Sequence, residues 1–205
     1  MSRTSMDMTR GSLKKQILFF SIPLMLSNLL QVLFNMSDIA VIGQFAGAMS
    51  LGAVGSTTTL ISMYTGFLIG LSGGINVLTA LYIGARNRKS VSETVHSAFL
   101  VSLAVGLILL ILGVSTSRGV LVLLNTKEEL IDKAALYIRI YFLGIPALAL
   151  YNFGNAVFSA AGDTGRPLRY LFLSGIVNVI LNLIFVIVCK LDVVGVALAS
   201  ALSQC

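Results

Sequence analysis

Long uncharged runs alternate with short charged segments along this 205-residue chain. The uncharged runs cover residues 16–37, 39–85, 94–117, 140–162, 170–189 and 193–205. They are blocks of Leu, Ile, Val and Ala without the alternation of a strand, and most approach the ~20 residues that an α-helix needs to cross a bilayer. The pattern therefore predicts membrane-spanning helices and argues against a transmembrane barrel.

Charged and Gly-rich positions divide these runs into six expected helices. Their bounds lie near 15–42, 51–82, 93–116, 132–160, 167–189 and 193–205, after a cytoplasmic N-terminal segment of residues 1–14. The long second run contains a turn marked by Gly43, Gly47 and Gly52. Only eleven residues run from Gly195 to Cys205, about half of a crossing. We therefore expect the sixth helix to be incomplete and the chain to be part of a longer protein.

The composition agrees with a membrane protein and disfavours several other classes. Hydrophobic residues make up 57% of the chain, charged residues 11%, and the mean hydropathy is +0.95, whereas a soluble domain carries about 25% charged residues. The two cysteines form no CxxC motif and His96 is the single histidine, so we expect neither a disulfide scaffold nor a zinc site. We do not expect an enzyme. The metalloprotease motif HExxH is absent, and an aspartyl protease needs two carboxylates, whereas the expected spans contain one acid.

Basic residues are concentrated on one side of the expected helices. Nine lie before the first helix or in the loops after the second and fourth, namely Arg3, Arg10, Lys14, Lys15, Arg86, Arg88, Lys89, Arg166 and Arg169. The opposite side has five, diluted by acids. Since cytoplasmic loops carry an excess of Lys and Arg, the N-terminus is predicted to be cytoplasmic. This asymmetry also accounts for the net charge of +6 without a nucleic-acid partner.

Asp38 is the acidic residue inside an expected span. A carboxylate within the bilayer costs about 2.5–3.5 kcal/mol on insertion scales, and such groups usually face a cavity. Asn28, Gln31 and Asn35 precede Asp38 at helical spacing, so a polar stripe is expected on the first helix. Two interpretations stay open: an ion site, or a solvated helix end whose neighbouring amides only join helices.

Further polar side chains lie in the later helices. Asn178 and Asn182 are four residues apart and share a face of the fifth helix, Asn152 and Asn155 lie in the fourth, and Ser200 lies in the sixth. Each alone is more typical of helix packing. Together with Asp38 they predict a polar pocket that could bind a proton or a small cation through oxygen atoms.

Glycine and proline mark packing and bending positions within the helices. Gly66, Gly70 and Gly74 form GxxxGxxxG in the second helix, which predicts a close-packing face. Pro23 and Pro146 each remove a backbone donor and can bend their helices. Pro23 could be a static kink or a hinge for alternating access.

Several short motifs occur in an order that resembles the multidrug and toxic compound extrusion (MATE) family. They are Ser21-Ile22-Pro23, Asn35-Met36-Ser37-Asp38, Ile42-Gly43, Gly70-Leu71-Ser72, Ala85-Arg86-Asn87, Tyr137-Ile138-Arg139-Ile140-Tyr141, Gly144-Ile145-Pro146, Ala161-Gly162-Asp163-Thr164 and Gly195-Val196-Ala197-Leu198-Ala199. The resemblance extends over essentially the whole chain.

This resemblance implies an all-α polytopic membrane protein whose residues 15–205 form the first six-helix lobe of a twelve-helix transporter. It implies a second, C-terminal six-helix lobe as partner, location in the bacterial cell membrane, and export of amphipathic, often cationic, drugs in exchange for H⁺ or Na⁺. No cofactor besides the coupling ion is implied, and this fragment is expected to be inactive by itself.

The resemblance also assigns roles to residues. Asp38 is the expected coupling acid, with Asn178 and Asn182 as further ion-coupling residues, and Pro23 is the expected hinge. The expected polar network or substrate cleft consists of Gln31, Asn35, Asn155 and Ser200. The family often has an Asp where this chain has Asn182, so the choice between H⁺ and Na⁺ stays open.

A lipid-linked oligosaccharide flippase of the same superfamily is the alternative. Such proteins usually line their cleft with arginines, whereas no Lys or Arg lies deep in a span here.

Overall fold

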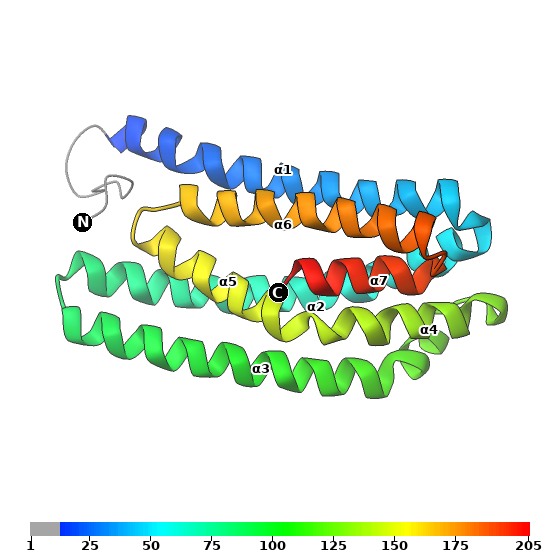
Figure 1. Ribbon diagram of the computed structural model, residues 1–205. Helices are drawn as coiled ribbons and strands as arrows, with labels where there is room; N and C mark the ends of the chain where they lie inside the picture. Colours follow the sequence, from blue (N-terminus) through cyan, green and yellow to red (C-terminus); the bar gives the residue numbers. More distant parts are fainter. Residues whose placement is uncertain (1–12) are drawn as a thin grey trace.

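The structure is a bundle of helices that run roughly along one direction (Figure 1). The computed structural model describes residues 13–205, so the predicted N-terminal segment 1–14 falls almost entirely outside the described residues. The described elements are α1 (Leu13–Phe45), α2 (Gly47–Gly84), α3 (Arg88–Leu123), α4 (Glu128–Leu143), α5 (Ile145–Ala160), α6 (Gly165–Leu183), the π-helix η1 (Ile184–Val188) and α7 (Asp192–Ser203). The prediction of an all-helical chain is therefore confirmed over the described residues.

The helices have the length and apolarity of membrane spans. Within the described residues four helices are long and apolar enough to cross a bilayer, and α4 with α5 adds a fifth if this bent pair is one span. Large hydrophobic side chains such as Leu18, Met25, Met63, Leu100 and Ile111 are exposed on the outside of the bundle. In a bilayer these surfaces face lipid tails instead of water.

The single helix expected over residues 132–160 is two helices. The axes of α4 and α5 differ by 48°, and the break falls at Gly144. Pro146 is the second residue of α5, and it has no N–H with which to continue the helical hydrogen bonds across the break. The expected helix over residues 132–160 is therefore divided at Gly144, two residues before the proline at which the sequence predicts a bend.

The turn between the first two helices is shorter than expected. Gly43 lies inside α1 and Gly52 inside α2, and Ala46 alone separates the two helices. Gly47 begins α2 with φ of +83°, a left-handed conformation that glycine adopts without a steric penalty. The expected Gly-rich turn thus reduces to a sharp reversal at residues 46 and 47.

The end of the chain has an irregular course. After α6 the backbone widens into η1, turns through Cys189, Lys190 and Leu191, and re-enters the bundle as α7. The C-terminus lies about midway along the bundle, near the α4–α5 break (Figure 1). A Cβ on Gly144 would lie 2.9 Å from the Cα of Ala201, so the glycine allows α7 to approach the break.

Close contacts between aromatic rings and glycines fix the helices relative to one another. Phe142 of α4 is fully buried, and a Cβ on Gly113 of α3 would lie 1.9 Å from its ring. Phe34 of α1 packs in the same way on Gly175 of α6, where an added Cβ would lie 1.7 Å from Cζ of the Phe34 ring. These pairs are the close packing that glycine permits in membrane helices.

The glycines of the GxxxGxxxG motif make no such contact. A Cβ on Gly66, Gly70 or Gly74 would meet no atom within 4 Å in the described part of the chain. The predicted close-packing face of α2 is therefore not used within this bundle.

Candidate functional site

Asp38 lies where α1, α6 and α7 meet. Asn182 of α6 donates a hydrogen bond from Nδ2 to Oδ1 of Asp38 at 2.5 Å, and Ser200 of α7 donates from Oγ to Oδ2 at 3.2 Å. Asn182 also donates to Oδ1 of Asn178 at 3.1 Å, and Nδ2 of Asn178 lies 3.5 Å from Ser200 Oγ. The four side chains thus form one connected network across three helices.

The directions of these hydrogen bonds suit an ionised Asp38. Both of its oxygens accept, one from an amide and one from a hydroxyl, as a carboxylate requires. Oδ1 of Asn182 is buried and has no hydrogen-bond partner, although this side chain is 0% exposed. A buried acceptor without a partner is costly, and such groups often mark a functional position.

Local packing explains why these groups meet. Phe34 and Asp38 lie four residues apart on one face of α1, and Gly175 and Asn178 lie three apart on α6. Insertion of the Phe34 ring over Gly175 therefore sets the register that brings Asp38 opposite Asn182.

Two tyrosines of α4 complete the surroundings of Asp38. Tyr137 and Tyr141 are both close enough to interact electrostatically with its carboxylate, and their rings stack with centroids 6.1 Å apart. The sequence identified them only within a family motif and gave them no role beside Asp38. Their spacing of four residues, on one face of a helix, was the signal that could have linked them.

The remaining predicted site residues lie apart from this network. Gln31 and Asn35 are exposed on α1, as is Asn28, and none of the three bonds Asp38. Asn155 of α5 accepts from Ser159 in its own helix at 3.4 Å. Pro23 lies inside α1, where its carbonyl accepts from Ser27 at 2.9 Å. The structure therefore brings together Asp38, Asn178, Asn182 and Ser200. The other predicted site residues, Gln31, Asn35, Asn155 and Pro23, lie outside this network.

Comparison with known families identifies the chain. The family model MatE matches residues 23–184. This chain belongs to the MATE family. The resemblance found in the sequence is thereby confirmed, and the chain is a multi-pass membrane protein of a transporter family.

Individual relatives agree with this assignment. The chain is 32% identical over 198 residues to the probable multidrug resistance protein YpnP of Bacillus subtilis, covering 97% of this chain and 44% of that protein. It is 27% identical over 191 residues to a protein of Shewanella oneidensis named FAD transporter, with 91% and 42% covered.

A solved structure of a MATE protein in the bent conformation superimposes with a TM-score of 0.91 at 27% identity, covering 98% of this chain and 45% of that one. The MATE chain thus spans about 45% of the length of these relatives, and its fold matches the N-terminal lobe.

The side chains of the network in this MATE chain offer oxygen atoms, which are the ligands that hard cations prefer. One carboxylate, two amides and a hydroxyl supply oxygen atoms, and the described residues contain no cluster of three His, Cys, Asp or Glu side chains. Oxygen ligands without soft donors do not suit a transition metal. The site can hold a proton on Asp38, or a small cation if the Asn182 amide rotates to present its oxygen.

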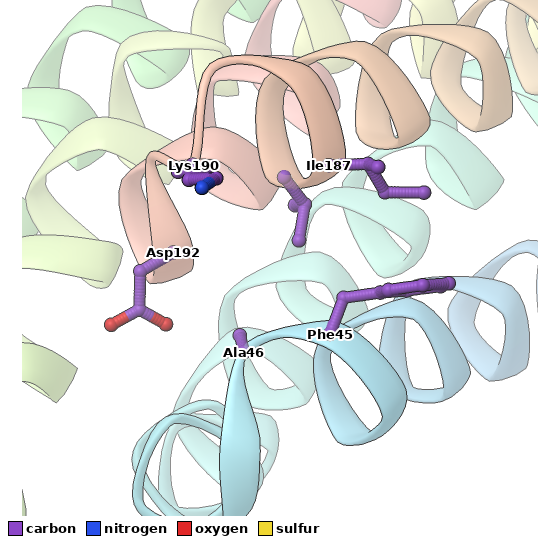
Figure 2. A pocket seen from close by; sticks show the side chains of 6 residues that line it. Phe45, Ala46, Ile187, Lys190 and Asp192 are labelled. Atoms are coloured by element: carbon purple, nitrogen blue, oxygen red, sulfur yellow. The ribbon is translucent and has the colours of Figure 1, made fainter.

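A separate cavity of about 380 Å³ lies where the turns α1–α2 and η1–α7 meet (Figure 2). Phe45, Ala46, Val186 and Ile187 give it apolar walls, and Lys190 and Asp192 lie at its border. It does not include Asp38 and is distinct from the network above.

Proposed function

We propose that this chain is the ion-coupling lobe of a secondary active multidrug exporter in the bacterial cell membrane. The transporter exchanges amphipathic, often cationic, compounds for H⁺ or Na⁺. The observation that carries the proposal is the Asp38 carboxylate held by Asn182 and Ser200 at the junction of three helices. A lone acid in that position can change charge within the membrane, as coupling requires.

Coupling follows from competition between two arrangements of the site. With Asp38 ionised, Asn182 and Ser200 donate to it. A bound proton or Na⁺ neutralises the carboxylate, and a half-turn of the Asn182 amide then offers its unused Oδ1 to that proton or ion. The packing of α1 against α6 and α7 differs between the two states, with Pro23 as the hinge. Ion and drug stabilise different arrangements, so each promotes release of the other.

The drug is proposed to bind in a cleft between this lobe and a second six-helix lobe. The exposed amides Asn28, Gln31 and Asn35 give α1 a polar surface for it. Among the described basic residues, Arg139 is exposed and bonds Ser117, away from the Asp38 network. The three exposed side chains named for this surface are neutral amides and not arginines, which favours a cationic cargo over a lipid pyrophosphate.

A chimera tests the proposal. The 205-residue chain replaces the matching part of the YpnP protein, and ethidium export is measured in inverted vesicles with the H⁺ and Na⁺ gradients collapsed separately. We expect export that stops when one of the two gradients is removed. Export that survives loss of both gradients, or transport of lipid-linked pyrophosphates instead of ethidium, contradicts the proposal.

Asn182→Asp tests whether the network is the cation site. The change places a second carboxylate beside Asp38 Oδ1, which the amide now contacts at 2.5 Å. Two adjacent carboxylates attract a cation strongly, so Na⁺ affinity is expected to rise about tenfold or more. Na⁺-dependent thermal stabilisation of the chain in lipid nanodiscs measures this.

Asn152→Asp is the matched control, because Asn152 bonds only the Leu148 carbonyl of its own helix among the described contacts. Equal Na⁺ responses of the two variants would exclude the network as the ion site.

The proposed orientation places the N-terminus in the cytoplasm and Cys189 outside. Cys189 is exposed at the η1–α7 turn, at the end of the bundle opposite the loop before α3 (Figure 1). In a Cys205→Ala background, a membrane-impermeant maleimide is expected to label Cys189 in intact cells. Arg88→Cys in a cysteine-free chain is the control and should react only after the cells are opened. The reverse pattern would invert the orientation.

A further inference from the structure

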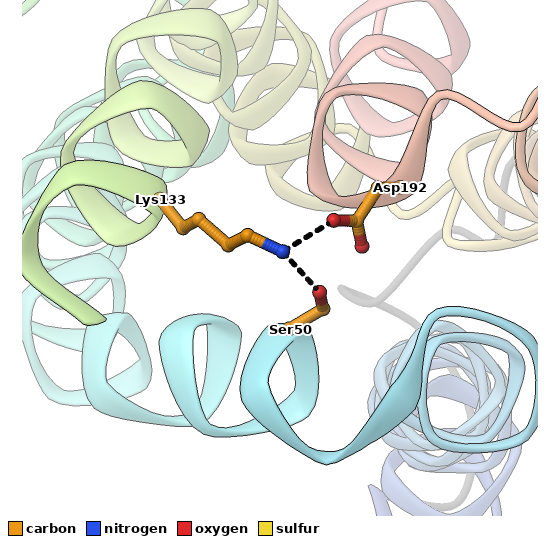
Figure 3. Close-up of polar contacts among 3 residues, drawn as sticks. All are labelled: Ser50, Lys133 and Asp192. Carbon is orange, nitrogen blue, oxygen red and sulfur yellow. Dashed lines mark hydrogen bonds and ion pairs between the residues drawn. The ribbon is translucent and has the colours of Figure 1, made fainter. Parts of the chain in front are cut away.

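Three helices are joined by one lysine at the end of the bundle that carries the η1–α7 turn. Lys133 of α4 donates from Nζ to Asp192 Oδ2 at 2.7 Å and to Ser50 Oγ at 3.1 Å (Figure 3). Ser50 of α2 is fully buried. The side chains of Lys133 and Asp192 are 39% and 34% exposed, so the ion pair is partly shielded from water. We call these three residues the outer clamp.

The outer clamp is in register with the groups around Asp38. Lys133, Tyr137 and Tyr141 follow one another at intervals of four on α4, and Asp192, Val196 and Ser200 do so on α7. α4 and α7 pack along one another. Eight residues of helix, about 12 Å, therefore separate the ion pair from Ser200 on the same face.

Both ends of α7 are fixed against α4. At the inner end Ala201 packs on Gly144, where a Cβ would lie 2.9 Å from the Ala201 Cα. At the outer end Asp192 enters the helix with φ of +53°, a conformation that non-glycine residues rarely adopt. The bonds to Lys133 hold Asp192 in this strained geometry, and such strain is often found at functional positions.

The pKa of the Asp192 carboxyl lies below its usual value. Partial burial raises this pKa, but the hydrogen bond from Lys133, the nearby Ser50 hydroxyl and the charge of Lys133 together lower it by more. The Asp192 carboxyl therefore stays ionised at neutral pH, and the ion pair is lost only as the pH falls through this lowered pKa. Titration of Asp192 therefore does not interfere with measurements near neutral pH.

We propose that Lys133 and Asp192 are positioning residues that hold α7 in the register in which Ser200 donates to Asp38. The inference rests on the proposed ion-coupling function and adds a second, outer set of residues to it. When the clamp opens, α7 is free to shift along α4 and Ser200 leaves the carboxylate. The clamp thereby influences how readily the inner site takes up its ion.

The neighbouring cavity gives the clamp room to open. Asp192 and Lys190 border the space of about 380 Å³ beside the turn (Figure 2). An Asp192 released from Lys133 can turn toward this space, which makes separation of α7 from α4 sterically feasible.

Single variants and a charge exchange test the inference in the YpnP chimera. Lys133→Gln and Asp192→Asn are each expected to lower the maximal rate of ethidium export about fivefold, with little change in KM. They should also shift the pH of half-maximal export by about 0.5 unit or more, because the surroundings of Asp38 change. The combined exchange Lys133→Asp with Asp192→Lys restores the ion pair and should recover most of both effects.

Asp132→Asn is the matched control. Asp132 pairs with Arg118 at 3.3 Å at the same end of the bundle, but the side chain of Asp132 is 82% exposed and that of Arg118 is 67% exposed. Its removal should leave the rate and the pH profile unchanged. Clamp variants that behave like this control overturn the inference, as do single variants that lower only the amount of protein in the membrane.

Failure of the two proposals is distinguishable. An unmodified chimera without ion-driven export contradicts the proposed function. Intact ion-driven export with unaffected clamp variants contradicts only the clamp. The maleimide labelling rate of Cys189 in the unfused 205-residue chain reports the register of α7 against α4 independently. This rate should rise about threefold in the single variants and return to its original value in the Lys133→Asp, Asp192→Lys double variant. An unchanged rate also overturns the inference.

Discussion

Asp38→Asn is expected to reduce ion-driven ethidium export by the chimera about a hundredfold. The asparagine has nearly the same shape and still accepts one hydrogen bond, but it stays neutral throughout the cycle. The site then has no charge for a proton or Na⁺ to neutralise, so the two arrangements of α1 against α6 and α7 are no longer coupled to the gradient. Export driven by either gradient, measured in inverted vesicles, checks this.

The folding of the variant is checked separately. Asp38→Asn should reach the membrane in normal amounts, because removing a charge from a partly buried position relieves desolvation. Asp132→Asn, which neutralises an exposed acid of α4, is the control and should export at the original rate. Gradient-driven export that survives in Asp38→Asn would remove Asp38 as the coupling acid and leave the membrane fold unaffected.

Gly175→Ala is expected to cause the largest loss of stability among single methyl additions on α6. The new Cβ would lie 1.7 Å from Cζ of Phe34, so the ring or a helix must move. Overpacking of this kind typically costs about 1–3 kcal/mol. Because Phe34 is one turn from Asp38, the displacement should also separate Asp38 from Asn182. The apparent melting temperature in detergent measures the first effect.

Two further variants make this prediction specific. Gly66→Ala adds the same methyl group to a helix where no atom lies within 4 Å, so it should be neutral or stabilise by up to ~1 kcal/mol. Phe34→Ala combined with Gly175→Ala removes the collision, and the pair should be more stable than the sum of the two single effects. Strictly additive effects would show that Phe34 does not pack on Gly175.

The open glycine face of α2 illustrates the limit of pattern reasoning. Gly66, Gly70 and Gly74 have the spacing of a packing face, yet nothing in the described chain occupies it. Gly113 and Gly175 have no such spacing, yet both receive aromatic rings. Spacing shows which residues share a face of a helix, but not which neighbour covers that face.

The site was predicted only in part, because the sequence shows which residues share a helix face but not what each face contacts. The costly acid and the paired amides of the fifth expected helix were visible because each is unusual in its local context. Asn35 and Asn155 had the same residue type and similar spacing, but α1 exposes the former and α5 turns the latter toward its own Ser159. Lys133 and Ser50 gave no local signal, since their contact joins positions 83 residues apart.

The sequence by itself determined the helical membrane architecture, because long uncharged apolar runs have one stable form in lipid. It also supplied Asp38, the bend near Pro146 and the family resemblance. The tertiary structure alone decided which of the predicted polar side chains join the Asp38 network, namely Asn178, Asn182 and Ser200, and that Lys133 bonds Asp192. These contacts depend on the rotation and register of whole helices, which side chains such as Phe34 and Gly175 set through packing across the bundle.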